Sequence, residues 1–218
     1  KFEELYALCS SPERYLKKVG NKIISQPIKG TAARSKDLEE DAQLLEALQE
    51  DEKERSENIM IVDLVRNDLS KTAQKGSVNV ENLCEAYTFK QVHQLISTVT
   101  SQLKSDLPSV AALQTSFPMG SMTGAPKVSA MQIIEASEST KRGLYSGSIG
   151  YFTPKGDFDF NVVIRSILYN AKANYVSYMV GSAITEKSIT EKEFQECLVK
   201  AKALQQVLVP NLESNYFH

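Results

Sequence analysis

Lys29 is the residue whose type and surroundings most directly suggest chemistry. It follows an apolar residue, precedes Gly30-Thr31 and comes soon after a turn signal at Gln26-Pro27. A lysine amine is a nucleophile only when it is unprotonated. Its pKa, about 10.4 in water, must therefore be lowered by a desolvated pocket or by neighbouring cations. The alternative is an exposed surface lysine, which burial statistics favour for this residue type.

Two pairs of glutamates have helical spacing. Glu54 and Glu57 lie three residues apart, and so do Glu193 and Glu196, which places each pair on one helix face. Carboxylates from two helices can together hold Mg²⁺. Two solvated acidic faces are the alternative, and the spacing alone does not decide between them.

A glycine-bearing loop, Gly120–Lys127, leads into a predicted helix, with Pro126 where that helix would start. Free backbone N–H groups and the positive end of the helix dipole could bind an anion such as a carboxylate. The spacing departs from GxxxxGK[ST], which disfavours a nucleotide-binding P-loop. An ordinary helix-start loop fits these residues equally well.

The composition indicates a globular protein with enough apolar material for a core. The chain has 218 residues, 42% of them hydrophobic, with 25 basic and 27 acidic side chains. This balance disfavours nucleic-acid binding, which needs a basic surface. Cys9, Cys84 and Cys197 are too far apart for a CxxC motif and favour a reducing cytosol. No apolar run approaches the roughly 18 residues that span a bilayer, so no membrane association is expected.

Apolar periodicity predicts helices and strands in an α+β arrangement, with antiparallel sheets and surrounding helices. The predicted helices are Leu38–Leu48, Ile59–Leu69, a short one from Leu107, Val128–Ala136 and Thr190–Val207. Glu50–Glu57 is expected to be a solvated helix face, and Ile59–Leu69 to be largely buried. Thr190 is predicted to be an N-cap, with Glu193 in capping-box spacing.

Strands are predicted from β-branched and aromatic runs between turn residues. They lie at Leu5–Leu8, within Tyr15–Thr31, at Val78–Val80 and at Tyr87–Thr100, followed by a β-meander of Ser146–Thr153, Phe158–Tyr169 and Tyr175–Thr185. The segment Pro27–Arg34 is predicted to be a loop, which would place Lys29 at its mouth.

Six ordered motifs together resemble the chorismate-binding enzymes, the family of anthranilate, aminodeoxychorismate, isochorismate and salicylate synthases. The motifs are Ser11–Arg14, Pro27–Thr31, Glu57–Asp68, Gly120–Lys127, Ile164–Ser166 and Glu193–Glu196. The resemblance covers nearly the whole chain and implies antiparallel sheets stacked with helices around a central cleft. It also implies that residues 1–218 are the C-terminal catalytic portion of a chorismate-binding domain, with an N-terminal part outside this chain.

Within the family, Pro27-Ile28-Lys29-Gly30-Thr31 resembles the form found in aminodeoxychorismate synthases, whereas anthranilate synthases typically have alanine where Lys29 stands. The resemblance implies that Lys29 attacks C2 of chorismate and displaces the C4 hydroxyl. Ammonia then adds at C4 and expels the lysine, giving 4-amino-4-deoxychorismate for p-aminobenzoate and folate synthesis. Glu13 resembles the family's general acid/base, a role that needs a raised pKa.

The remaining site residues are also implied by the resemblance. Mg²⁺ would hold one carboxylate of chorismate through Glu57 and Glu196, with Glu54 and Glu193 as outer partners. The other carboxylate would meet a guanidinium fork and nearby donors, and further residues would line the cleft. These substrate-binding residues are Arg165, Tyr145 and the backbone near Gly181, together with Ser121, Gly30 and Thr31.

Two positions depart from the family pattern. The family commonly has a histidine where this chain has Gln94, and His93 lies one residue earlier, on the opposite face of a strand. No role is therefore assigned to His93. The family's Gly-x-Gly-Ile reads Gly181-Ser182-Ala183-Ile184, so backbone access at Ala183 is expected to be narrower.

The cysteine pattern leads us to expect a cytoplasmic enzyme, and the resemblance implies that a separate glutamine amidotransferase subunit supplies its ammonia. The alternatives are anthranilate synthase component I, or an isochorismate or salicylate synthase, against which Lys29 is the evidence. A catalytically silent, anion-binding fragment is an alternative of another class.

Overall fold

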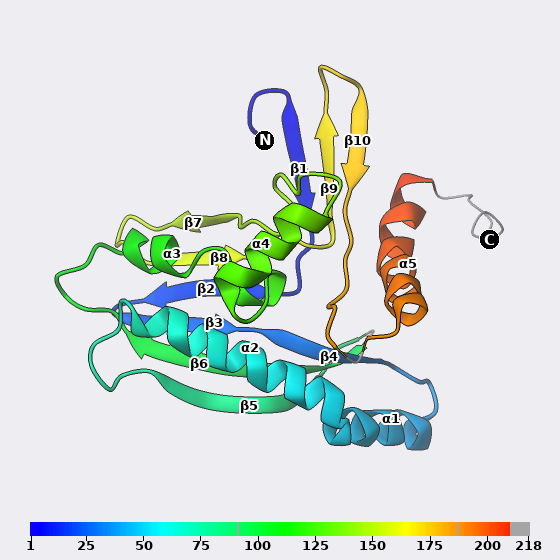
Figure 1. Ribbon diagram of the computed structural model, residues 1–218, viewed down its shortest axis with the longest axis horizontal. Helices are drawn as coiled ribbons and strands as arrows, with labels where there is room; N and C mark the ends of the chain where they lie inside the picture. Colours follow the sequence, from blue (N-terminus) through cyan, green and yellow to red (C-terminus); the bar gives the residue numbers. More distant parts are fainter. Residues whose placement is uncertain (91, 187, 210–218) are drawn as a thin grey trace. The chain divides into compact units, whose positions relative to one another are not determined.

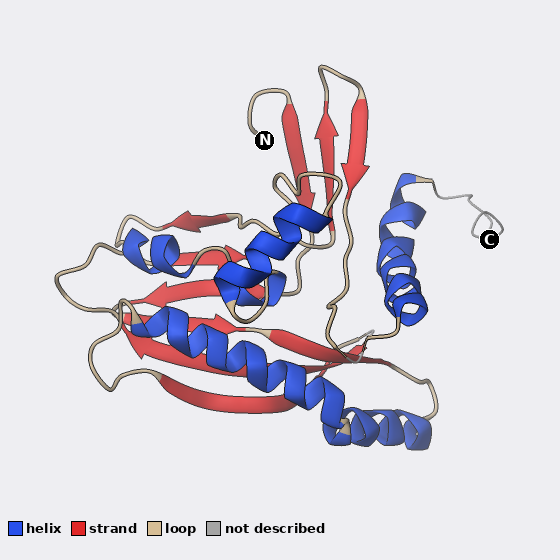
Figure 2. Ribbon diagram, viewed as in Figure 1, coloured by secondary structure: helices blue, strands red, loops and turns tan. Residues whose placement is uncertain are grey.

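The computed structural model describes residues 1–90, 92–186 and 188–209, and the chain forms two compact units. The larger unit comprises Glu13–Lys141 and Ser146–Val162. The smaller unit comprises Lys1–Pro12, Arg142–Tyr145 and the described residues from Val163 onward. Both contain antiparallel strands together with helices (Figures 1 and 2), so the predicted α+β class is confirmed.

The larger unit is built on an antiparallel sheet in the order β4-β6-β3-β2-β8-β7, with β5 paired to the other edge of β6. The most central strand is β6, whose residues from His93 to Ser101 are all buried. The strands are β2 (Arg14–Val19), β3 (Lys22–Gln26), β4 (Ile28–Ala33), β5 (Asn79–Thr88), β6 (Val92–Gln102), β7 (Gly150–Phe152) and β8 (Phe158–Asn161). Because β6 pairs with β4, β3 and β5, it fixes their mutual register.

The prediction of a loop at Pro27–Arg34 is wrong, because Ile28–Ala33 forms strand β4. The prediction rests on the turn residues Gln26-Pro27. Within the strand, Gly30 has a φ of +87°, a conformation more typical of a turn. Here that conformation makes a β-bulge. Ile28 pairs with Ile96 and Thr31 with Gln94, so three steps along β4 match two along β6. Lys29 therefore lies in a bulged strand and not in a loop.

Helices α1 (Leu38–Glu50) and α2 (Glu52–Ser70) pack against β4, β5 and β6 (Figure 1), and both confirm their predictions. Asp37 caps α1 by accepting the N–H groups of Glu39 and Glu40, and Asp51 caps α2 by accepting that of Glu54. The segment Ile59–Leu69 is only partly buried. Its core-facing residues are Ile61, Val62, Val65 and Leu69, while Ile59 and Met60 are exposed.

The rest of the larger unit contains α3 (Val110–Ser116), the 3₁₀ helix η1 (Gly120–Met122) and α4 (Lys127–Ser137). These positions confirm the predicted short helix and the helix after Pro126. The predicted strand Tyr87–Thr100 is confirmed from Val92 onward, where it is part of β6, but its start is wrong, because Tyr87 and Thr88 are the end of β5. Apolar and β-branched residues on both sides of the turn hide the break from periodicity.

The smaller unit contains a sheet in the order β1-β9-β10 and helix α5. Their bounds are β1 (Leu5–Cys9), β9 (Ser166–Asn170), β10 (Tyr175–Tyr178) and α5 (Thr190–Leu208). The first predicted strand and the last predicted helix are confirmed. The capping box at α5 is not formed, because Ile189 occupies the N-cap position without a side-chain cap bond and Thr190 is the first helical residue.

The predicted β-meander is wrong. Phe158–Tyr169 is divided into β8 and β9, which belong to different sheets. The break comprises residues 162–165, which include Val162 and Val163, both almost fully buried, and Arg165 at a φ of 50°. Burial keeps the sequence apolar through the break, so hydropathy predicts one strand where the chain passes from one sheet to another.

Within the described residues, Cys9, Cys84 and Cys197 form no disulfide. In residues 1–90, 92–186 and 188–209, no helix combines the length and the apolar character that a bilayer span requires.

The bulge generates a testable prediction at Gly30. A Cβ there would lie 3.2–3.3 Å from side-chain atoms of Leu48, Glu54 and Leu95, and φ is positive. We expect Gly30→Ala to lower the free energy of unfolding by about 2–3 kcal/mol, measured by chemical denaturation. Gly76→Ala is the matched control, because Gly76 has a φ of +76° with no atom within 4 Å. It should lose only about 1 kcal/mol. Equal losses would show that the helices do not constrain the bulge.

Candidate active site

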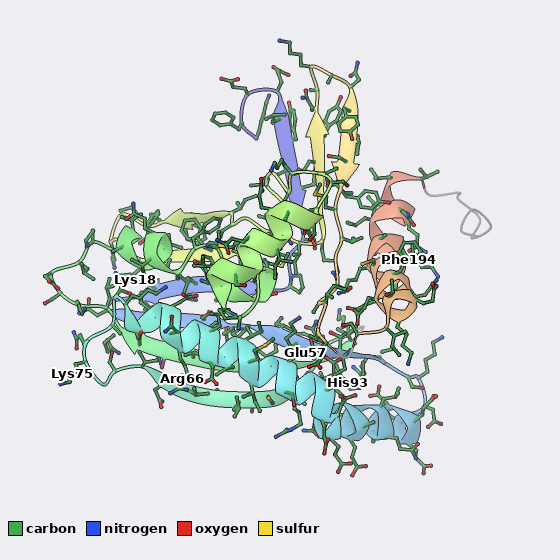
Figure 3. All side chains as sticks on the ribbon, viewed as in Figure 1. Lys18, Glu57, Arg66, Lys75, His93 and Phe194 are labelled. Carbon is green, nitrogen blue, oxygen red and sulfur yellow. The ribbon has the colours of Figure 1, made fainter. Side chains whose placement is uncertain are left out.

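The Lys29 side chain is mostly buried, with 20% of its surface exposed. Its Nζ lies 3.7 Å from Oε2 of Glu57 on α2, and Figure 3 labels Glu57 on the half of α2 nearest α1. Glu57 also contacts the exposed Lys53, at 3.9 Å. The expectation of an ordinary surface lysine therefore does not describe Lys29.

Glu13 is a buried acid immediately before β2, with 8% of its surface exposed. Burial raises its pKa to about 7, against the opposing effects of a hydrogen bond from Ser121 and the charge of Lys29. Its backbone carbonyl accepts the N–H of Val162, at 3.1 Å, which fixes the chain at this point. Three residues assigned to one site from sequence, Glu13, Lys29 and Ser121, are thus electrostatically coupled in the larger unit.

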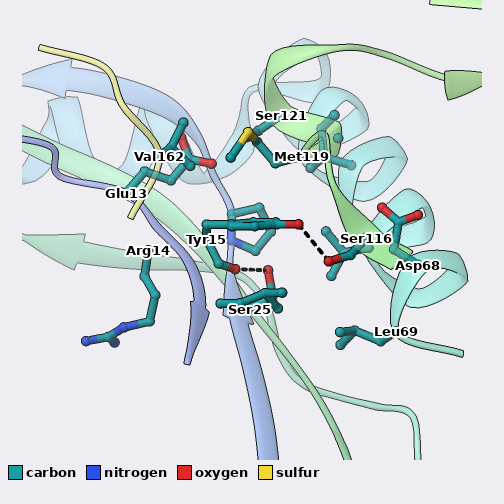
Figure 4. Close-up of a pocket in the computed structure, with 15 residues that line it drawn as sticks. Glu13, Arg14, Tyr15, Ser25, Asp68, Leu69, Ser116, Met119, Ser121 and Val162 are labelled. Atoms are coloured by element: carbon teal, nitrogen blue, oxygen red, sulfur yellow. Dashed lines mark hydrogen bonds between the residues drawn. The ribbon is translucent and has the colours of Figure 1, made fainter. Parts of the chain in front are cut away.

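A small cavity lies beside Glu13 and Ser121 (Figure 4). Its volume is about 20 Å³, which suits a single water and is far below the size of an organic substrate. Tyr15 and Ser116 on its wall share a hydrogen bond of 2.6 Å between their hydroxyls. Burial, as the largest cause, raises the pKa of Tyr15, so its phenol stays neutral.

The loop before α4 is held by an ion pair beneath it. Lys127 donates to Asp68, at 2.5 Å, and to the carbonyl of Ser116, at 2.8 Å. Asp68 is 4% exposed and also accepts from Lys71, at 3.0 Å. The charge of Lys127 is therefore neutralised inside the larger unit, and its contacts anchor the loop that carries Ser121. Anion binding at this loop stays a prediction.

Tyr145 and Gly181 are neighbours in the smaller unit. A Cβ added to Gly181 would meet the Tyr145 hydroxyl at 2.9 Å, so only glycine leaves that hydroxyl in place. Lys200 donates to the Gly181 carbonyl, at 3.0 Å, and also pairs with Glu196. Arg165 belongs to the same unit, with its backbone carbonyl accepting the N–H of Ser10.

The four glutamates assigned to Mg²⁺ are divided between the units. Glu54 and Glu57 lie on α2, and Glu193 and Glu196 lie on α5. Burial, followed by the charge of Glu57, raises the pKa of Glu54, as expected for two neighbouring carboxylates. In the described ranges, no three acidic, histidine or cysteine side chains gather closely enough to hold a metal. The Mg²⁺ site stays a prediction.

His93, left unassigned from sequence, is a buried structural residue in the larger unit. It is 1% exposed and bonds to Asp41 and to Thr88, each at 3.0 Å. Arg34 pairs with the same aspartate through two nitrogens, and this hydrogen bonding is the main reason that the Asp41 pKa lies far below its usual value. Gln94, on the other face of β6, lies opposite Thr31 in the β4–β6 register.

Sequence reasoning missed Asn58, which is fully buried on α2. Its amide nitrogen donates to the carbonyls of Lys29 and Leu95, at 3.4 and 3.3 Å. A polar residue beside an apolar helical stripe is a usable signal, because it must find partners if it is buried.

Comparison with known proteins identifies the family. The sequence pattern described as "chorismate binding enzyme" matches residues 1–206. The chain belongs to the chorismate-binding enzyme family. It is 47% identical to a probable chloroplastic aminodeoxychorismate synthase of Oryza sativa subsp. japonica, over 92% of this chain and 22% of that protein. It is 46% identical to the aminodeoxychorismate synthase of Streptomyces griseus, over 95% of this chain and 28% of that protein.

A solved relative in the same family supports the fold. Anthranilate synthase component I from Streptococcus pneumoniae matches with a TM-score of 0.82 and 34% identity, over 93% of this chain and 44% of that one. The chain therefore spans less than half the length of each of these family members.

The burial of Glu13 predicts a specific pH dependence of stability. A glutamate in the unfolded chain ionises near pH 4.5, and Glu13 in the folded protein near 7. Between these values the unfolded state releases its proton first, so wild-type stability falls as the pH rises. Below pH 4.5 Glu13 is protonated in both the folded and the unfolded chain, and above pH 7 the cost of burying its ionised carboxylate is constant. Relative to wild type, the free energy of unfolding of Glu13→Gln should therefore rise by up to roughly 3 kcal/mol between pH 4.5 and 7.

The measurement is the free energy of unfolding against pH for wild type and Glu13→Gln. Glu81→Gln is the control, because Glu81 is exposed and its hydrogen bond from Lys22 lowers its pKa. The ionised Glu81 stabilises the folded protein above the pKa that it has in the unfolded chain, and this stabilisation is lost as the pH falls. Glu81→Gln should therefore lose stability relative to wild type, whereas Glu13→Gln should gain it. Parallel curves for wild type and Glu13→Gln would refute the raised pKa.

Proposed function

We propose that this chain carries part of the active site of an aminodeoxychorismate synthase, which converts chorismate and ammonia to 4-amino-4-deoxychorismate. The observation that carries the proposal is the placement of Lys29, a largely buried amine 3.7 Å from Glu57 and within the electrostatic reach of Glu13. A nucleophile and a carboxyl with a pKa near 7 are the pair that covalent substitution with proton transfer needs.

The proposed reaction has two balanced displacements. The neutral Lys29 amine forms a bond to C2 of chorismate, both ring double bonds shift, and the C4 hydroxyl leaves as water after it receives a proton. The Lys29 nitrogen gives up one proton once its bond to C2 has formed. Ammonia then bonds to C4, both double bonds shift back, and Lys29 leaves C2 as an amine, taking up the proton that the new C4 ammonium loses. Glu13 supplies the proton for the departing hydroxyl, because its pKa of about 7 keeps a protonated fraction at neutral pH.

The remaining predicted residues would hold the two carboxylates of chorismate. Mg²⁺ would bind one of them through Glu57 and Glu196, with Glu54 and Glu193 behind, and would neutralise its charge. The donor set fits, since hard carboxylate oxygens are the ligands that Mg²⁺ prefers. The other carboxylate would meet the guanidinium of Arg165, with donors near Gly181 and Tyr145. Gly30, Thr31 and Ser121 would line the ring.

Anthranilate synthesis is the second candidate, because a solved relative at 34% identity is an anthranilate synthase component I. Lys29 argues against it, since direct amination of chorismate needs no protein nucleophile at this position. Isochorismate or salicylate synthesis is disfavoured on the same ground. The proposal also includes ammonia supply by a glutamine amidotransferase, a place in p-aminobenzoate and folate synthesis, and a cytoplasmic location.

The test supplies chorismate, Mg²⁺ and ammonia to the complete protein. The expected product needs a lyase to become p-aminobenzoate, and Lys29→Ala should lower kcat by at least about 100-fold because the nucleophile is gone. Lys53→Ala is the matched control. Lys53 also contacts Glu57, but its side chain is 52% exposed, and the variant should keep kcat within about twofold.

Three results would contradict the proposal. Direct formation of anthranilate, isochorismate or salicylate would reassign the reaction. Unchanged turnover in Lys29→Ala would remove the lysine from the mechanism. A complete protein that binds chorismate without converting it would favour the anion-binding alternative.

A further inference from the structure

The backbone around Lys29 is held by a side chain of α2. Asn58, which is fully buried, donates through Nδ2 to the carbonyls of Lys29 on β4 and Leu95 on β6. These carbonyls flank the bulge where the β4–β6 register shifts. One amide group therefore bridges both strands at the point where regular pairing is interrupted.

The orientation of this amide is fixed by a directional chain of hydrogen bonds. The N–H of Cys84 donates to Ser97 Oγ, at 2.9 Å, so the Ser97 hydroxyl must use its own proton elsewhere. It donates to Asn58 Oδ1, at 2.5 Å. The Asn58 oxygen thus faces Ser97, and both protons of Nδ2 are directed at the two carbonyls.

The start of this chain is also set by a bulge. Cys84 has a φ of 50°, and the β5–β6 register shifts between Asn82 and Glu85. The Cys84 N–H consequently meets a serine side chain on β6. Ser97 and Asn58 together connect the β5–β6 bulge on one edge of β6 to the β4–β6 bulge on its other edge.

Adjacent residues of α2 contact Lys29 at both of its ends. Asn58 bonds to its carbonyl, and Glu57 lies 3.7 Å from its amine. Rotation of the Lys29 peptide would break the first contact and swing the side chain away from the second. The Asn58 amide therefore limits the directions in which the amine can point.

We infer that Asn58 is a positioning residue, which fixes the Lys29 peptide so that the amine points toward Glu57 and toward the substrate position. The catalytic consequence rests on the proposed function, but the orientation of Lys29 does not. A purely structural role is the competing interpretation. In that case Asn58 only satisfies two buried carbonyls, and its loss lowers stability without redirecting Lys29.

The experiment replaces Asn58 by aspartate in the complete protein. Aspartate can still accept from Ser97, but it has at most one proton to donate where asparagine has two. Lys29 acylation by an amine-selective reagent is measured by peptide mass spectrometry, with Lys53 as the internal reference, alongside kcat, KM and the thermal midpoint. Asn67→Asp is the matched control, because it makes the same change at an exposed position of α2.

In Asn58→Asp the released Lys29 should be acylated roughly threefold or more faster relative to Lys53, because it leaves its partly buried ion pair. Its kcat should fall roughly 100-fold, the effect expected of misplacing a reacting group by about 1 Å, while KM stays within about twofold. Asn67→Asp should match wild type in every measurement.

Unchanged acylation with a lower thermal midpoint would overturn the positioning role in favour of the structural one. Faster acylation in a protein that never aminates chorismate would keep the positioning role and refute the proposed function. If Asn58→Asp does not fold, Ser97→Ala provides the test. It keeps the amide but removes the group that orients it, and unchanged Lys29 acylation in that variant would also overturn the inference.

Discussion

The bulge at Lys29–Gly30 is the constraint on which the larger unit depends. At Gly30 the side chains of Leu48 from α1, Glu54 from α2 and Leu95 from β6 converge, and a Cβ would lie 3.2–3.3 Å from each of them. Only a hydrogen atom fits there without displacing a neighbour. Both helices can consequently lie close against β4, which brings the first turns of α2 to Lys29.

Close packing also determines which buried acids keep a proton. Asp41 and Asp68 are buried with Arg34, Lys127 and other donors beside them, so each acid is paired with a cation. Glu13 is equally buried, but burial outweighs the stabilising effects of Ser121 and Lys29, and its pKa rises to about 7. Paired acids hold the framework together, whereas an acid left with an incompletely compensated charge can exchange a proton near neutral pH.

The sequence predicted those elements whose periodicity is unbroken. The helices at Leu38–Leu48 and Ile59–Leu69, and the α+β class, follow from regular spacing of apolar residues. Features set by long-range pairing could not be predicted. The turn residues Gln26-Pro27 indicate a loop until the pairing of β4 with β6 is known, and the apolar run from Phe158 to Tyr169 conceals a change of sheet.

The site shows the same division between local and long-range information. The motifs indicated Lys29, Glu13 and Ser121, whose coupling in the larger unit depends on β2, β4 and the loop before α4. Asn58 lies inside the motif Glu57–Asp68, where its place beside an apolar stripe indicates only that it needs partners if it is buried; which partners it has depends on the long-range pairing of β4 and β6. Burial of His93 against Asp41 likewise explains a residue whose role the motif order left open.

The central claim, that Lys29 is a nucleophile, is tested most directly by trapping its adduct. The complete protein is mixed with chorismate and Mg²⁺ without ammonia, quenched with acid and digested for mass spectrometry. The account predicts that the peptide containing Lys29 gains the mass of chorismate less one water, and that the adduct disappears when ammonia is added before the quench. Ammonia-dependent product formation with no adduct at Lys29, or with an adduct at another residue, would contradict it.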